Sequence, residues 1–182
     1  MTDDPTKYHR RSIRLNGYDY SQTGAYFITV CTQGRECLFG GVVDGEIRLN
    51  EYGKIAVNSW KDIPAHFRNA KLDAFLVMPN HIHGIIMIVG ARHAVPLHQE
   101  QFGKPIPCSI STIIRSFKSA VTKRINELRQ TSGIGFWQRN YYEHIIRVDD
   151  ELNNIREYIT NNPLRWHEDE ENPINPLRIN KP

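Results

Sequence analysis

Two apolar runs near the middle of the chain constrain its fold most strongly: "KLDAFLVMP" (71–79) and "HIHGIIMIV" (81–89). Both have the length of a β-strand, and neither approaches the ~18–20 apolar residues of a membrane span. Pro79 and Asn80 separate the runs, and such a pair favours a turn. The pattern therefore predicts either two strands or one strand bent at the proline, buried on at least one face.

The remaining segments alternate between strand and helix patterns. β-Branched and aromatic residues, or an Asp-Gly turn between short apolar pieces, predict strands, while apolar residues three and four apart predict helices. The expected strands are 25–33, 136–148 and a hairpin at 40–50, and the expected helices are 51–67 (interrupted near Pro64), 109–130 and 149–162. Residues 91–108 contain three prolines and are predicted to form a loop. The order βββαββαβα favours an α+β fold with helices packed on one side of an antiparallel sheet.

The chain length of 182 residues suits a single domain, 1–182, with a basic N-terminal arm (about 1–20) and an acidic, proline-containing tail (about 167–182). The formal net charge is only +3, but basic residues gather at 7–14 and 115–124. Local basic patches are typical of nucleic-acid binding and equally of an ordinary mixed surface. Charge alone therefore does not assign a partner.

The start of the chain and its cysteines favour a cytoplasmic protein with no membrane association. "MTDDPTKYHRR" has no apolar stretch behind its charges, so it does not look like a signal peptide. Cys31, Cys37 and Cys108 form no CxxC pair. This spacing favours free thiols in a reducing compartment over a disulfide or a zinc knuckle.

Two histidines, His81 and His83, stand one residue apart at the start of the second apolar run. On a strand they share one face, about 6.5–7 Å apart along the backbone, while Ile82 points to the other face. Two imidazoles so placed can share a divalent metal if a third ligand arrives from elsewhere. The alternative, favoured by the short motif alone, is a pair of hydrogen-bonded strand histidines.

A tyrosine and an asparagine four residues apart, Tyr158 and Asn162, project from one face of the last expected helix just before Pro163. Packing at the helix edge is the more common role for such a tyrosine, and an asparagine is expected where a helix ends. The pair becomes informative only together with the His-x-His strand and the basic helix 109–130.

Four separated blocks give the chain a resemblance that each short motif alone would not carry. The sequence resembles the HUH single-strand DNA transposases with one catalytic tyrosine, and especially the REP-associated tyrosine transposases. The similarity spans roughly residues 8–166, and the matching blocks are "RRSIRLNGYDYSQTGAYFITVCTQGRECLFG", "MPNHIHGIIMI", "RSFKSAVTKRIN" and "FWQRNYYEHIIRVDDELNNIREYITNNPLRW". The resemblance implies the ferredoxin/RRM-like fold of HUH nucleases.

The resemblance also implies a chemistry for the named residues. His81 and His83 match the family's metal-binding histidines, Asn162 matches its polar third ligand, and Tyr158 matches its nucleophile. A metal-dependent single-strand DNA endonuclease and transposase is thus expected, acting through a 5′-phosphotyrosine intermediate at REP-like palindromic hairpins. The neutral donors suit Mg²⁺ or Mn²⁺. The expected partner is single-stranded or hairpin DNA, and the protein is expected to be a monomer or a homodimer.

Residues for DNA contact are expected from charge and aromaticity. Basic side chains neutralise phosphates, and aromatic or guanidinium planes stack on unpaired bases. The candidates are Arg10, Arg11, Arg14, Arg115, Lys118, Lys123, Trp137, Arg139 and Tyr141. For Trp137, packing in the core is an equally good reading.

Two other functions fit the same residues. The chain could be a catalytically silent hairpin-binding protein, or a metal hydrolase that activates water at His81 and His83. A general base is not evident, since His144 is a candidate but is better read as a hydrogen-bonded strand histidine. The acidic stretch 167–172 could also fold back over a basic groove and mimic DNA.

Overall fold

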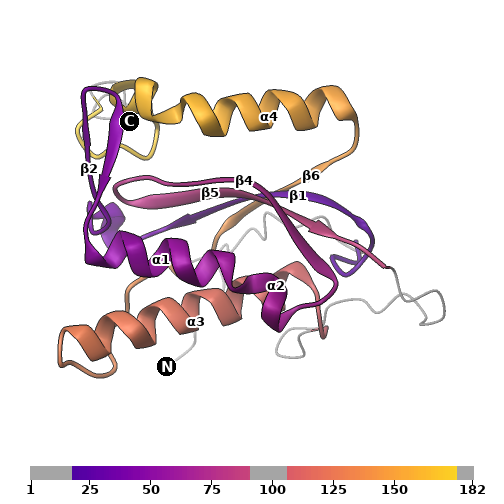
Figure 1. Cartoon of the computed structure of the whole chain (residues 1–182), viewed down its shortest axis with the longest axis horizontal. Helices are drawn as coiled ribbons and strands as arrows, with labels where there is room; N and C mark the ends of the chain where they lie inside the picture. Colours follow the sequence, from indigo (N-terminus) through magenta and orange to yellow (C-terminus); the bar gives the residue numbers. More distant parts are fainter. Residues whose placement is uncertain (1–17, 91–105, 176–182) are drawn as a thin grey trace, which may run out of the picture.

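The structure is a computed structural model that describes residues 18–90 and 106–175 (Figure 1). Its β-strands are β1 (Gly24–Cys31), β2 (Gly40–Val43), β3 (Glu46–Leu49), β4 (Ala70–Val77), β5 (His81–Ile88) and β6 (Tyr142–Ile146). Its α-helices are α1 (Glu51–Lys61), α2 (Ile63–His66), α3 (Ile110–Leu128) and α4 (Asp149–Asn161), with short 3₁₀ turns at Gln33–Arg35 and Asn162–Glu168. The two apolar runs thus form separate strands.

The central sheet has the order β4-β5-β1-β6, and every neighbouring pair is antiparallel. β1 and β5 pair over their whole length, which sets Cys31 opposite His81 and Thr29 opposite His83. A second, two-stranded sheet is formed by β2 and β3. Both turn residues of that hairpin, Asp44 and Gly45, adopt positive φ angles (53° and 75°), as an Asp-Gly hairpin turn requires.

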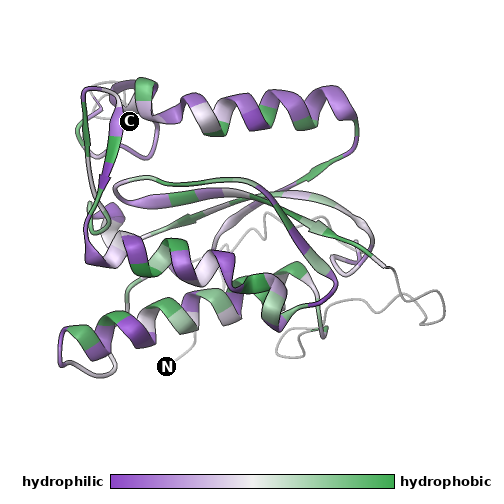
Figure 2. Ribbon diagram, viewed as in Figure 1, coloured by the Kyte–Doolittle hydropathy of each residue, from purple (hydrophilic) through white to green (hydrophobic). Residues whose placement is uncertain are grey.

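One face of the central sheet is covered by α1, α2 and α3 (Figure 1). α3 starts at Ser109, whose hydroxyl accepts a hydrogen bond from the backbone N–H of Thr112. The apolar side of α3 then packs against the strands, and Figure 2 shows this amphipathic pattern along the helix. Trp60 of α1 and Phe117 of α3 meet edge to face in this core, at 5.1 Å between ring centroids.

The opposite face of the sheet carries α4 (Figure 1). A second, smaller apolar cluster joins Ile159 of α4 to Ile85 of β5 and Ile146 of β6. The α+β class and the antiparallel sheet are confirmed, but the expected placement of helices on one side holds only for α1, α2 and α3. Because β5 alternates apolar residues toward both faces, the sheet needs a cover on each side.

The expected strand 136–148 is also corrected, because only Tyr142–Ile146 forms β6, while Trp137 makes an isolated antiparallel bridge to Thr32. Phe136 and Trp137 lie in the core instead, where they contact each other and Phe39. Their aromatic content mimics a strand in sequence, but their rings fill the space beside α3. Among residues 18–90 and 106–175, no helix combines the length and apolarity needed to cross a bilayer.

Candidate active site

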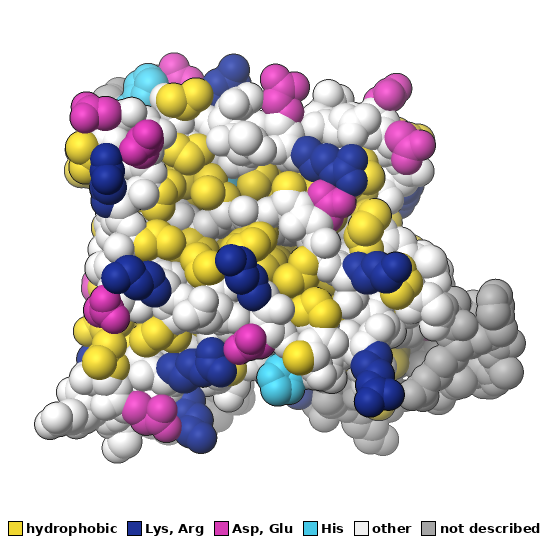
Figure 3. All heavy atoms as spheres, in the orientation of Figure 1, with side chains coloured by type: hydrophobic (Ala, Val, Ile, Leu, Met, Phe, Trp, Pro, Cys, Tyr) yellow, Lys and Arg dark blue, Asp and Glu magenta, His cyan; other side chains and the backbone are white. Residues whose placement is uncertain are grey.

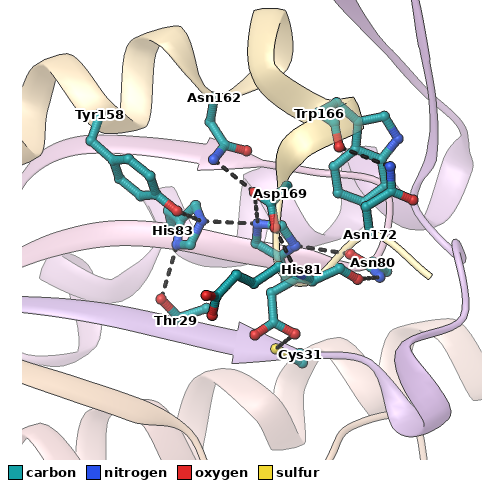
Figure 4. Close-up of polar contacts among 12 residues, drawn as sticks. Thr29, Cys31, Asn80, His81, His83, Tyr158, Asn162, Trp166, Asp169 and Asn172 are labelled. Atoms are coloured by element: carbon teal, nitrogen blue, oxygen red, sulfur yellow. Dashed lines mark hydrogen bonds and ion pairs between the residues drawn. The ribbon is translucent and has the colours of Figure 1, made fainter. Parts of the chain in front are cut away.

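His81 and His83 lie at the start of β5, and their side chains point toward α4 (Figure 4). The exposed fraction is 0% for His81 and 3% for His83. Strand alternation sends Ile82 to the opposite face, into the core with α1 and α3. The sheet therefore holds the two imidazoles on one buried surface, as their spacing predicted.

The orientation of the His81 ring is set by Asn80. The Asn80 amide N–H₂ donates to the carbonyls of Arg35 (2.9 Å) and Glu171 (2.7 Å), so its oxygen must face the ring. That oxygen lies 2.8 Å from His81 Nδ1 and can only accept, so Nδ1 carries the proton. His81 Nε2 is thereby left with a free lone pair.

The two rings face each other through their Nε2 atoms, which are 2.9 Å apart. On its other side, His83 Nδ1 lies 2.9 Å from the hydroxyl of Thr29 on β1. Burial lowers the pKa of His81 to about 3, and burial together with the neighbouring His81 holds the pKa of His83 well below its usual range. Both rings are therefore neutral, and their Nε2 atoms can converge on one cation.

Tyr158 of α4 reaches the same spot from the other side (Figure 4). Its hydroxyl oxygen lies 3.3 Å from His83 Nε2, within the same chain. The ring packs edge-on against Phe27, with 6.1 Å between centroids, yet 47% of the residue is exposed. Burial of the hydroxyl raises the pKa of Tyr158 to about 12, and the carboxylates of Asp169 and Glu171 add to this shift.

Asn162 follows α4 and is buried beside this group. Its amide N–H₂ donates to Asp169 Oδ2 at 2.8 Å. Its amide oxygen is buried and has no hydrogen-bond partner among the described residues. A buried amide oxygen without a partner among the described residues is one kind of donor that a divalent cation uses.

Asp169 belongs to the site although the sequence did not single it out. Its Oδ2 lies 3.9 Å from His81 Nε2, and its carboxylate forms a buried group of potential metal ligands with His81 and His83. In the sequence it is one acid in the run "HEDEEN", whose members all look alike. Asp169 is the acid that points toward the histidines because of how the chain folds at and after the 3₁₀ turn, and this cannot be seen in the sequence.

Both the sequence and the fold have similar known proteins. No family model matches the sequence. An uncharacterized protein of Haemophilus influenzae is 41% identical over 169 residues, which cover 90% of this chain and 93% of that protein. A solved structure described as a REP-associated tyrosine transposase bound to a REP hairpin superposes with a TM-score of 0.57 at 18% identity, covering 87% of this chain and 74% of that one.

A second Haemophilus influenzae protein is named "Putative REP-associated tyrosine transposase" and is 25% identical over 148 residues, or 81% of this chain and 74% of that protein. The chain is thus similar in sequence to a protein named as a REP-associated tyrosine transposase and shares the fold of a solved one. The named relative agrees with the resemblance carried by the four sequence blocks, and the solved structure shares the fold.

The basic residues expected to contact DNA are placed unevenly in the structure. Arg10, Arg11 and Arg14 lie outside the described residues. Arg115 and Lys123 are exposed on α3, across the sheet from Tyr158. On the face drawn in Figure 3, Lys and Arg side chains stand singly around an apolar band, and Asp and Glu lie mainly toward the top, so no continuous basic path for a DNA strand is visible there.

Two other candidates for DNA contact, Trp137 and Lys118, have structural roles. Trp137 is 8% exposed and donates its indole N–H to the carbonyl of Lys118. Its ring therefore packs in the core and is not exposed for stacking on a DNA base. Lys118 donates to the carbonyls of Gln138 and Asn140, and burial lowers its pKa to about 8. Arg139 is exposed, and it stays a candidate for DNA contact.

The helix that carries Tyr158 is tied to the sheet by an ion pair. Arg156 of α4 donates from Nε and Nη2 to the two carboxylate oxygens of Asp73 on β4, at 2.8 and 2.6 Å. This pairing holds the pKa of Asp73 below its usual range. Both ends are partly exposed, so the pair stabilises the fold modestly.

We expect Asp73→Asn to make the protein less sensitive to acid. Because the pKa of Asp73 is lower in the folded chain than its ordinary value of about 3.9, the pair stabilises fully above that pH and is lost as pH falls through the folded pKa. The variant should lose less than about 1 kcal/mol near pH 7, and the difference from wild type should shrink toward pH 3. Urea unfolding at both pH values measures this, and the exposed Glu46→Gln is the control. An unchanged difference at low pH would contradict the linkage.

Proposed function

We propose that the protein is a metal-dependent single-strand DNA endonuclease and strand transferase that works through a 5′-phosphotyrosine intermediate at REP-like hairpins. The observation that carries the proposal is the 3.3 Å approach of the Tyr158 hydroxyl to His83, beside two neutral imidazoles whose Nε2 atoms face each other. The family relationship supports DNA processing, and the hairpin bound in the related structure suggests the kind of substrate.

His81 and His83 would hold the divalent ion, with Asn162 as the expected third ligand. The residues fit such an ion because both rings are neutral and the Asn162 amide oxygen is buried without a partner among the described residues. Oxygen and imidazole donors suit Mg²⁺ or Mn²⁺. When bound, the ion would draw charge from a non-bridging phosphate oxygen and help to orient the phosphate.

Tyr158 would act as the nucleophile. Its oxygen would form a bond to the scissile phosphorus while the bond from phosphorus to the 3′ oxygen breaks, and the 3′ oxygen would leave as a hydroxyl with one proton. The 5′ phosphate of the downstream strand then stays on the tyrosine. A phenoxide is a better leaving group than an alkoxide, so attack by a 3′-hydroxyl can reverse the step without ATP.

The surroundings of Tyr158 suit this role in two ways. Phe27 and His83 contact its ring, which restrains the direction of the hydroxyl. The exposed part of the residue leaves a side on which a DNA strand can approach. Its raised pKa means that the free hydroxyl is protonated at neutral pH, so the proton must leave during the attack.

The test is a hairpin oligonucleotide with a single-stranded flank, labelled at its 3′ end because the downstream fragment keeps the covalent link. Incubation with Mg²⁺ or Mn²⁺ should produce a labelled protein band on a denaturing gel, and chelation by EDTA should prevent it. Binding of the hairpin without any adduct, under either ion, would instead support a catalytically silent hairpin-binding protein.

A further inference from the structure

The residues after α4 turn back over the histidine pair, and one carboxylate among them enters the site (Figure 4). The ligand atoms of His81, His83 and Asp169 all lie within 4.8 Å of one another, and all three residues are buried. Two atoms bound to one ion at about 2.1 Å lie about 3.0 Å apart at right angles and about 4.2 Å apart at opposite positions. The 3.9 Å from His81 Nε2 to Asp169 Oδ2 lies between these two values, and the 2.9 Å between the two Nε2 atoms lies just below the smaller one.

The Asp169 carboxylate lacks a cationic partner among the described residues. Its side chain is 3% exposed, and the contact that it makes there is with the His81 ring, 3.9 Å away, rather than with a lysine or an arginine. Arg35, the nearby guanidinium, pairs with Glu171 instead, at 2.9 Å. A buried carboxylate that no cation balances is costly, and a divalent ion between it and the two imidazoles would remove that cost.

Asn162 and the backbone hold this carboxylate in place. The Asn162 N–H₂ donates to Oδ2, and the backbone N–H of Glu171 donates to Oδ1 at 2.6 Å. In this arrangement Asn162 presents its nitrogen, not its oxygen, toward the atom nearest the histidines. Donation from an amide N–H to a ligating carboxylate is a common way to orient a metal ligand.

The turn that carries Asp169 is itself fixed by buried side chains. Asn172 donates to the carbonyl of Trp166 at 2.8 Å, and Asn175 donates to the carbonyl of Asp169 at 2.9 Å. Asn80, which orients the His81 ring, also donates to the carbonyl of Glu171. The carboxylate and the imidazole are thus positioned by the same asparagine.

From these contacts we infer that Asp169, in place of the expected Asn162, is a protein ligand of the ion held by His81 and His83, and that Asn162 positions its carboxylate. The inference rests on the proposed function only in taking the site to bind a divalent ion. It gives the site one negative charge, which strengthens binding of a hard divalent cation relative to neutral donors alone. It also makes the chain beyond α4 part of the catalytic centre.

The test is a titration of the full chain with Mn²⁺ in the absence of DNA, followed by calorimetry or by the Mn²⁺ electron paramagnetic resonance signal. Asp169→Asn should weaken Mn²⁺ binding at least about tenfold, since loss of even an orienting partner of a ligand costs about 10–100-fold. His81→Ala should weaken it at least as much. Glu170→Gln, the exposed neighbouring acid, is the matched control and should bind Mn²⁺ as wild type does.

A melting experiment separates lost binding from lost folding. In EDTA, Asp169→Asn should melt at or above the wild-type temperature, because the variant no longer buries an unbalanced charge. Added Mn²⁺ should raise the melting temperature of wild type and of Glu170→Gln more than that of Asp169→Asn. Equal shifts in all three proteins would overturn the assignment.

The alternative is that the carboxylate occupies the place of a substrate phosphate, as a DNA mimic would. Asp169→Asn would then leave Mn²⁺ affinity unchanged and increase hairpin cleavage, and this result would overturn the assignment. The Mn²⁺ titration needs no DNA. Failure to trap a phosphotyrosine adduct would therefore refute the proposed reaction but would not bear on Asp169 as a metal ligand.

Discussion

Tyr158→Phe is expected to abolish the covalent DNA–protein adduct and to slow hairpin cleavage at least about 1,000-fold, because it removes only the attacking oxygen. The ring contacts with Phe27 and His83 remain, and part of the residue is already exposed, so the fold should not change. The measurement is the 3′-labelled hairpin assay, with free cleaved strand and protein-linked strand quantified on one denaturing gel.

Tyr142→Phe is the matched control for this experiment. Tyr142 lies on β6, is 44% exposed and also packs edge-on against Phe27, but its hydroxyl is not at the histidine pair. It should retain adduct formation. Cleavage that survives in Tyr158→Phe would contradict the proposal and would identify water as the nucleophile, as in a metal hydrolase.

Gly84→Ala should produce the largest loss of stability, about 3 kcal/mol or more, because a methyl group there overpacks the core. Gly84 lies on β5 between the site histidine His83 and Ile85, and a Cβ atom would stand 2.3 Å from Cζ2 of the Trp60 ring. Trp60 is fully buried, and its ring packs against Phe75 and Phe117. For a chain of this length, such a loss lowers the melting temperature by about 6–12 °C.

Calorimetry or thermal circular dichroism measures this change. Gly41→Ala on β2 is the control, since nothing lies within 4 Å of a Cβ atom there, and it should melt near the wild-type temperature. Because a shift of β5 also moves His83, Gly84→Ala should bind Mn²⁺ more weakly even below its melting temperature. A variant as stable as wild type would mean that the Trp60 ring has freedom to shift.

The order of elements could be predicted because each follows from local chemistry. The Asp44-Gly45 turn, the break at Pro79-Asn80 and the apolar stripe of α3 each lie within one stretch of sequence. The strand 136–148 was predicted too long because aromatic residues favour a strand and a core turn alike. Periodicity also cannot say which face of a sheet a helix covers, so the position of α4 had to come from the structure.

In the candidate site, too, the residues set by local sequence could be predicted, and those set by long-range contacts could not. Strand alternation was sufficient to put His81 and His83 on one face, and the family resemblance pointed to Tyr158. Asp169 could not be predicted, because its role depends on a turn that docks far from it in sequence, against Asn80 and Arg35. Long-range docking of this kind leaves no periodic signal in the acidic run.

The Tyr158 hydroxyl lies 3.3 Å from His83 of the same chain, and this predicts the result of mixing inactive variants. In the proposed reaction, the Tyr158 hydroxyl acts beside His83 of its own chain, so one copy would not need a reacting group from another. Blending Tyr158→Phe protein with His83→Ala protein should not rescue either, and diluting wild type with either one should reduce turnover only in proportion to the copies replaced. Recovery of cleavage in the blend would instead reveal helices exchanged between copies.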